Sequence, residues 1–151
     1  HLSATIPYFK ITKSKTNAGL RNVPVHPYIY PLLEKMVNQS TSKFLFSNLK
    51  MTVHQERSSA ISKRFGRLKT KLGYGANQVF HSFRHTAMTM FEQAGVNENI
   101  AMDIVGHEKP NLTFGHYSGG TSMEQRYTAT CKSINFPFHN IPAASLCKGT
   151  G

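Results

Sequence analysis

The stretch from His81 to Tyr117 constrains the chain more than any other segment, because it sets four chemical groups in a fixed order. His81 and Arg84 come first, Gly106-His107 follows an apolar run, and Tyr117 stands ten positions after His107. Two imidazoles and a guanidinium suit an anionic phosphate, and a phenol can become a nucleophile when a phosphate is held against it. The order therefore predicts one pocket in which a phosphate meets a tyrosine.

The ordered set resembles the signature of the tyrosine recombinases, the phage integrase family, which is His-x-x-Arg, a later Gly-His and a Tyr soon after it. The resemblance implies that His81, Arg84 and His107 are catalytic and hold a DNA phosphate, and that Tyr117 attacks it. The product would be a tyrosine linked to a 3′ phosphate. The resemblance implies no cofactor and no metal ion.

Two short extended stretches, Ile6 to Ile11 and Arg21 to Val25, are separated by turn-forming residues and predict a β-hairpin. The family carries a catalytic lysine in such a hairpin, followed by Arg-x-Val-Pro, and Lys15 matches this lysine, with Lys13 as the alternative. Arg21 stands in a Gly-x-Arg context, but it runs straight into the second strand. We interpret it as a structural residue or a contact to the phosphate backbone.

Apolar residues at helical spacing, together with capping residues, predict the helical part of the chain. The helices are expected over His26–Val37, Thr52–Leu72, His81–Ala94, from Asn97 to Gly106, and from Thr121 to about Lys132. Thr52 would cap the second helix, and Thr121 with Glu124 would form a capping box for the last one. The fold class is therefore mainly α with a small antiparallel β-hairpin or sheet (α+β).

The resemblance implies the catalytic-domain fold of the tyrosine recombinases for residues 1–138, with 139–151 as a flexible tail. The first catalytic arginine of the family has no candidate here, and we expect it before His1, so the domain is interpreted as truncated at its N-terminus. We expect the 151 residues alone to bind DNA without cutting it. The complete protein would cut and rejoin double-stranded DNA, and the family works as a tetramer on two duplexes.

The charge of the chain supports a nucleic-acid partner. Lys and Arg number 18 against 7 Asp and Glu, a net charge of +11. Glu56 supplies the acid of the predicted Thr52–Leu72 helix, so intrahelical pairs do not explain its many cations. We expect its basic face to contact DNA phosphates, and a solvated charged face is the alternative. The candidate DNA-binding residues are Arg57, Lys63, Arg64, Arg67 and Lys71.

The sequence also argues against several other classes. No apolar run approaches the roughly 20 residues of a membrane span, and no signal peptide is visible. Cys131 and Cys147 fit no metal pattern, so we expect free thiols and a cytoplasmic protein. His81 and His85 have the spacing of a zinc pair, but the glutamate of His-Glu-x-x-His is missing.

Two other functions remain open. A type IB topoisomerase resembles the recombinases in its chemistry and would relax supercoiled DNA without site preference. A DNA-binding module without catalysis would show salt-sensitive binding and form no covalent adduct.

Overall fold

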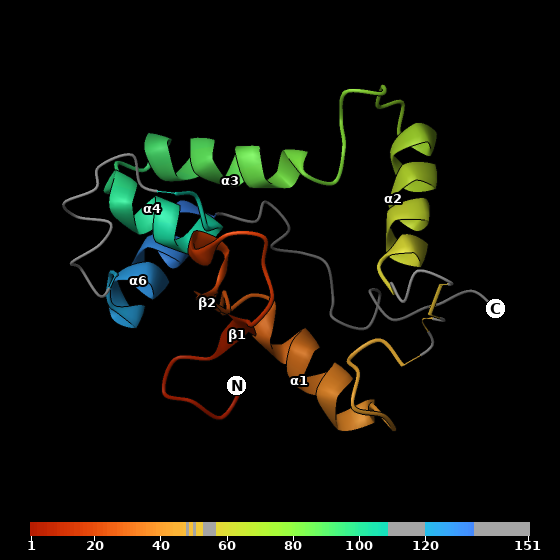
Figure 1. Ribbon diagram of the computed structural model, residues 1–151, viewed down its shortest axis with the longest axis horizontal. Helices are drawn as coiled ribbons and strands as arrows, with labels where there is room; N and C mark the ends of the chain where they lie inside the picture. The colour runs from red at the N-terminus through yellow and green to blue at the C-terminus, as the bar shows by residue number, and fades with distance from the viewer. Residues whose placement is uncertain (48, 50, 53–56, 109–119, 135–151) are drawn as a thin grey trace. The chain divides into compact units, whose positions relative to one another are not determined.

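The computed structural model describes residues 1–47, 49, 51–52, 57–108 and 120–134, and the chain divides into two compact units. One unit consists of His1–Lys35 together with Ala87–Gly151, and the other consists of Met36–Thr86. Each unit is described by itself below. Figure 1 shows the elements of both, which are mainly helices with one two-stranded sheet, as the sequence predicts.

The predicted hairpin is present in the first unit. Strands β1 (Tyr8–Ile11) and β2 (Arg21–Pro24) pair antiparallel, with Tyr8 opposite Pro24 and Ile11 opposite Arg21. The connection between them contains a short 3-10 helix, η1 (Asn17–Gly19). Pro24 cannot donate to the ladder, and the next N–H, that of Val25, donates to the carbonyl of Pro7 at 2.8 Å.

The core of the first unit lies where β2 meets two helices. Helices α4 (Glu98–Val105) and α6 (Met123–Ser133) pack on each other and on β2, as Figure 1 shows. Helix α3 (Ser82–Gln93) contributes Phe91, whose side chain is fully buried, and the cluster is completed by Ala101, Ile104, Val105 and Ala129. Burial of a phenylalanine contributes about 1.5–3 kcal/mol, so Phe91 fixes the end of α3 on α4.

The structure confirms the two capping residues predicted for α4 and contradicts the capping box predicted for the last helix. Asn97 caps α4 by accepting from the Asn99 N–H at 2.9 Å, and Gly106 ends it in the left-handed region with φ 77°, both as predicted. The capping box predicted for Thr121 and Glu124 is wrong. The structure forms the box one residue later, between Ser122 and Gln125.

The second unit is built around α2 (Ser59–Lys71). The prediction that Thr52 caps this helix is wrong, because the helix begins after Ser58 and Thr52 lies outside it. Helix α1 (Tyr30–Gln39) crosses from the first unit into the second, and it begins later than the predicted His26. In the ranges described above, no helix combines the length and the apolar character that crossing a bilayer demands.

His26 gives the first unit a predicted pH dependence. It follows β2, its Nδ1 accepts from the Tyr28 N–H at 3.1 Å, and burial lowers its pKa, which a hydrogen bond with the backbone of Ile134 partly offsets. Since the folded pKa lies below that of the unfolded chain, protonation favours unfolding. This contribution to stability is present above the unfolded pKa of 6.5 and is lost as the pH falls below that value and through the lower folded pKa.

We therefore expect the denaturant concentration at the unfolding midpoint to decrease when the pH is lowered from about 7.5 to about 5. The fall should be smaller in His26→Gln, which cannot be protonated, and a His85→Gln variant at an exposed position of α3 serves as the control. An equal fall in wild type and His26→Gln would show that other groups cause it.

Candidate functional site

The start of α3 carries three of the polar groups that the sequence singles out. His81 directly precedes the helix and Arg84 lies in its first turn, with the Arg84 N–H donating to the His81 carbonyl at 3.0 Å. The rings of His81 and His85 stand 5.1 Å apart in an edge-on arrangement. These side chains therefore share one helical face, as their spacing predicts. No group of three metal-ligating side chains occurs in the ranges for which the structure is described.

Two local devices fix the start of α3. The Ser82 hydroxyl accepts from the Val79 N–H at 3.0 Å, which ties the preceding turn to the helix. The rings of Phe65, Phe80 and Phe83 lie 5.2 to 5.7 Å from one another and join the start of α3 to α2. Each such pair contributes about 0.5–1.5 kcal/mol beyond its buried area. The backbone of His81 and Arg84 is therefore held against α2 within the second unit.

The aromatic cluster explains the exposure of Phe83. The periodicity of α3 predicts that Phe83 turns to a core, but 61% of Phe83 is exposed. The helix crosses from one unit into the other, so its two halves pack on different neighbours: Phe83 contacts Phe65 of α2, whereas Phe91 enters the core of the first unit.

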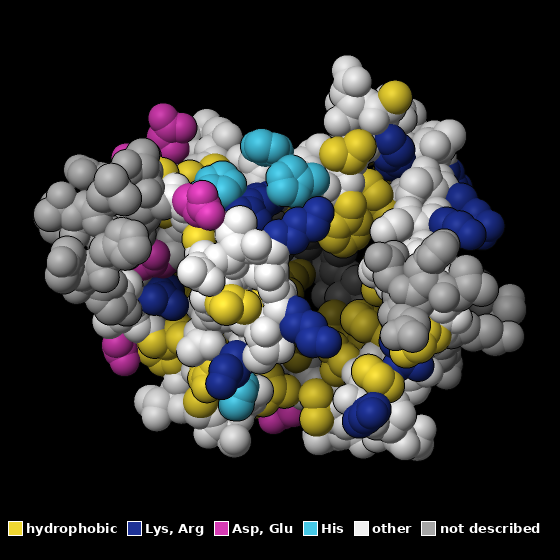
Figure 2. Space-filling model, viewed as in Figure 1, with side chains coloured by type: hydrophobic (Ala, Val, Ile, Leu, Met, Phe, Trp, Pro, Cys, Tyr) yellow, Lys and Arg dark blue, Asp and Glu magenta, His cyan; other side chains and the backbone are white. Residues whose placement is uncertain are grey.

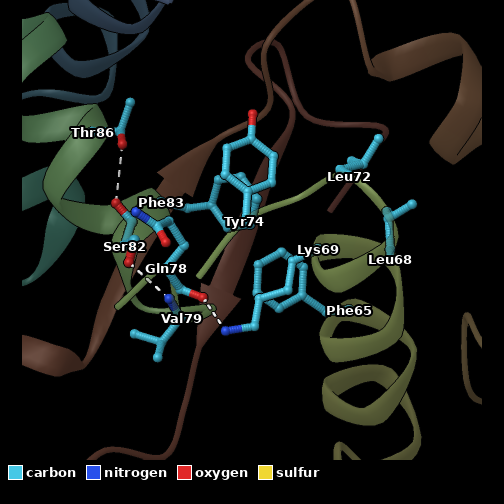
Figure 3. A pocket seen from close by; sticks show the side chains of 10 residues that line it. All are labelled: Phe65, Leu68, Lys69, Leu72, Tyr74, Gln78, Val79, Ser82, Phe83 and Thr86. Carbon is cyan, nitrogen blue, oxygen red and sulfur yellow. Dashed lines mark hydrogen bonds between the residues drawn. The ribbon is translucent and has the colours of Figure 1, made fainter. Parts of the chain in front are cut away.

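An apolar pocket of about 390 Å³ lies between α2 and the start of α3 (Figure 3). Two of its polar lining side chains donate to backbone carbonyls. The Lys69 ammonium donates to the carbonyls of Gly75 and Gln78 at 2.9 and 2.8 Å, and the Thr86 hydroxyl donates to the Ser82 carbonyl. The cation in this lining, Lys69, is thus held by two backbone carbonyls. The apolar side chains in its lining are Phe65, Leu68, Leu72, Val79 and Phe83.

Helix α2 presents the predicted basic face. Four of its cationic side chains are exposed, and Figure 2 shows Lys and Arg side chains over the helix that Figure 1 labels α2. They are Lys63, Arg64, Arg67 and Lys71. Arg57 differs from them, because it precedes the helix and its guanidinium lies 3.8 Å from the centre of the Phe44 ring. Four of the five predicted DNA contacts are therefore exposed cations, and Arg57 is half-buried against an aromatic ring.

His107 follows directly on the end of α4 in the first unit. The N–H groups of Gly106 and His107 both donate to the Met102 carbonyl, at 2.7 and 3.1 Å, which closes the helix. Only a residue that tolerates a positive φ turns the chain at this point without strain, and Gly106 is that residue. The backbone of His107 is fixed by this turn, and its side chain is half-buried.

The interpretation of Arg21 as a structural residue is confirmed. Its Nε donates to the Ile104 carbonyl and its Nη1 to the Gly19 carbonyl, both at 2.8 Å. Ile104 lies in the last turn of α4, where carbonyls have no partner within the helix. Arg21 therefore caps α4 while it holds the end of the loop that carries Lys15, which is exposed.

Tyr117 lies outside the described residues. From residue 120 the structure is described again, and a polar cluster that the sequence does not predict holds this part of the chain. The Thr121 N–H and hydroxyl donate to Asp103 Oδ2 at 2.7 and 2.9 Å. Arg126 donates to the Thr121 carbonyl and to the Asn22 carbonyl, and its Nη2 lies 3.9 Å from Asp103 Oδ2. Asp103 lies 18 residues before Thr121, and Asn22 lies 104 residues before Arg126, so no local pattern indicates these contacts.

The predicted catalytic residues divide between the two units. His81 and Arg84 belong to the unit Met36–Thr86, whereas Lys15 and His107 belong to the other. Within each unit the structure brings one pair of segments together. The face of His81 and Arg84 is joined to the basic helix α2, and the Lys15 loop is joined to the His107 turn.

Comparison with known proteins gives a family and two relatives. The model of a family described as "Phage integrase family" matches residues 2–122, which include every catalytic candidate. Two proteins named "Putative prophage phiRv2 integrase", from Mycobacterium tuberculosis strains CDC 1551 / Oshkosh and ATCC 25618 / H37Rv, are each 25% identical over 122 residues. The aligned part is 77% of this chain and 32% of each relative, so the chain spans about a third of their length. No solved structure gives a significant match.

Proposed function

This chain belongs to the phage integrase family, and from that premise we propose that it forms part of the catalytic domain of a site-specific recombinase that cuts and rejoins double-stranded DNA. The observation that carries the proposal is the face of α3 on which His81 and Arg84 stand together, joined through Phe65 and Phe83 to the basic helix α2. A duplex lying along α2 would bring a backbone phosphate to a guanidinium and an imidazole. Phosphate contacts of this kind position DNA independently of its sequence.

The proposed roles follow the charge that develops on the phosphate. Attack on a phosphodiester builds negative charge on its non-bridging oxygens, and Arg84 is suited to hold two of them at once. His81 and His107 donate hydrogen bonds to the same oxygens or accept the proton of the nucleophile. Each such donor, when fixed in advance, lowers the barrier by about 3 kcal/mol.

The proposed reaction exchanges one phosphate ester for another. The Tyr117 oxygen attacks phosphorus, its proton passes to an imidazole, and the bond from phosphorus to the 5′ oxygen breaks. The departing 5′ oxygen takes a proton from Lys15. The product is a phosphotyrosine at the 3′ end, which keeps the energy of the original ester, so a 5′ hydroxyl can reverse the step without ATP.

A covalent trap tests this function. The complete protein that contains this chain is incubated with a pool of nicked duplexes of varied sequence, in which the short 5′-hydroxyl fragment diffuses away after cleavage. We expect DNA-linked protein that survives denaturation. Trypsin should then release the modified peptide from His85 to Arg126, because Lys109 precedes Pro110, and this peptide contains Tyr117 as its single tyrosine. Modification of any other peptide would contradict the role of Tyr117.

The same experiment separates the recombinase from the topoisomerase alternative. A site-specific enzyme selects a narrow set of sequences from the pool, and a topoisomerase would attach to nearly all of them and relax any supercoiled plasmid. We further propose that the complete protein assembles as a tetramer on two duplexes, which light scattering of the complex on the selected site would measure.

The basic helix α2 gives a prediction about DNA affinity. Replacing Lys63, Arg64, Arg67 and Lys71 together with glutamine should weaken DNA binding and flatten its salt dependence. Each phosphate contact adds about 0.9 to the slope of log K against log salt, so the loss of four contacts lowers the slope by about 3 to 4. Fluorescence anisotropy between about 50 and 200 mM salt measures this slope.

The control is Lys35→Gln on α1, which removes one exposed charge outside the basic face and should leave the slope unchanged. If the fourfold variant keeps the wild-type slope, the face is a solvated charged surface, and the alternative weighed for this helix is correct.

A further inference from the structure

One guanidinium joins two segments that the proposed function uses separately. Arg21 Nε donates to the Ile104 carbonyl at the end of α4, and Arg21 Nη1 donates to the Gly19 carbonyl at the end of the hairpin loop, both at 2.8 Å. The guanidinium is planar, so both carbonyls are held in one fixed geometry. The loop end and the helix end therefore cannot shift independently while these bonds are kept.

On the loop side, the contact reaches both neighbours of Lys15. The Gly19 N–H donates to the Thr16 carbonyl at 3.1 Å, and Gly19 is buried so closely against Ser14 that a Cβ on Gly19 would collide with the Ser14 side chain. Lys15 stands between Ser14 and Thr16 and is itself exposed. Fixing Gly19 therefore fixes the backbone from which the Lys15 side chain leaves.

On the helix side, the contact reaches the residue before His107. Gly106 adopts φ 77°, and a Cβ on it would lie 2.6 Å from Arg21 Cζ. The guanidinium thus occupies the space that a side chain at position 106 would need. Gly106 is required here both for its backbone conformation and for the room that it leaves to Arg21.

We propose that Arg21 is the positioning residue for Lys15, because it anchors the loop that carries this lysine to the end of α4 beside His107. The inference rests on the proposed function, in which Lys15 protonates the departing 5′ oxygen. It goes further by naming the residue that fixes the backbone position of Lys15. Without this anchor Lys15 would be an exposed side chain on an unattached loop.

The chemistry of the leaving group provides a selective test. In a substrate whose bridging 5′ oxygen is replaced by sulfur, the bond from phosphorus to sulfur breaks and the sulfur departs as a thiolate. A thiol has a pKa of about 8.5, so its thiolate is stable enough to leave without a proton. Loss of a general acid therefore slows cleavage of the oxygen substrate and leaves cleavage of the sulfur substrate nearly intact.

We expect Arg21→Gln to lower the single-turnover cleavage rate of the oxygen substrate by about 10²-fold, the cost of a catalytic group misplaced by about 1 Å. The rate on the sulfur substrate should fall much less. Lys15→Gln should show the same selective loss, by about 10² to 10⁴-fold. Arg21→Lys, which can still donate one bond, should lie between wild type and Arg21→Gln. The ratio of the two rates does not depend on the folded fraction, because both substrates meet the same protein.

Two control variants test the selectivity. Arg126→Gln removes another half-buried arginine of the same unit, and Lys10→Gln removes an exposed charge from strand β1, outside the loop. Neither should alter the ratio of the two rates. Equal losses of Arg21→Gln on both substrates would overturn the inference while the adduct at Tyr117 still stands. Absence of any adduct in the wild type would overturn the proposed function and the inference together.

Discussion

Replacing Tyr117 with phenylalanine should abolish the covalent attachment of DNA to the complete protein while DNA binding stays within about twofold of wild type. The substitution removes one oxygen atom, the atom that would attack phosphorus, and it keeps the ring. A gel under denaturing conditions measures the adduct, and anisotropy on the same duplex measures binding. The effect is all-or-none because no other atom of a phenylalanine can form a phosphate ester.

The matched control is Tyr74→Phe, which removes a phenolic oxygen from an exposed tyrosine in the connection between α2 and α3. This variant should form the adduct at the wild-type rate. An adduct that persists in Tyr117→Phe would show that another group is the nucleophile, and the role assigned to Tyr117 would then be wrong.

Replacing Arg84 with alanine should lower the rate of adduct formation by about 10²- to 10³-fold, the usual cost of removing one fixed donor from a developing oxyanion. Arg84→Lys should recover only part of this loss, because an ammonium keeps the charge but cannot hold two oxygens in a planar fork. Single-turnover rates at saturating protein give the chemical step free of any change in affinity.

Arg64→Ala on α2 serves as the control for charge, since it also removes one guanidinium. It should weaken binding and leave the saturated rate unchanged, because Arg64 is proposed to contact phosphates away from the reacting one. If saturating protein restores the rate of Arg84→Ala, then Arg84 contributes to binding and not to the chemical step.

The sequence predicts those parts of the fold that depend on neighbours along the chain. The two ends of α4 are an example, because Asn97 before an apolar run and Gly106 after it indicate where a helix begins and where it ends. The hairpin is another, since two short extended stretches with turn residues between them have one simple way to pair. The common face of His81 and Arg84 follows from helical geometry alone.

The remaining features depend on residues that meet only in the folded chain. Thr121 looks like a capping residue by its spacing to Glu124, but its hydroxyl donates to Asp103, so Ser122 takes the cap. Phe91 is fully buried, but the sequence does not show that the two ends of its helix pack on different units. The two hydrogen bonds that Arg21 donates, to Gly19 and to Ile104, link the hairpin to a helix end 83 residues away.

The fit between Arg21 and Gly106 also bears on how relatives of this chain can diverge. A side chain at position 106 needs the volume that the guanidinium fills, and a shorter residue at position 21 would take this donor away from the Ile104 carbonyl. A change at either place therefore alters the cost of a change at the other. The sequences of the hairpin and of the helix end are thus expected to change together among relatives. A chimera that takes the hairpin from one relative and the helix end from another would pack poorly where the two meet.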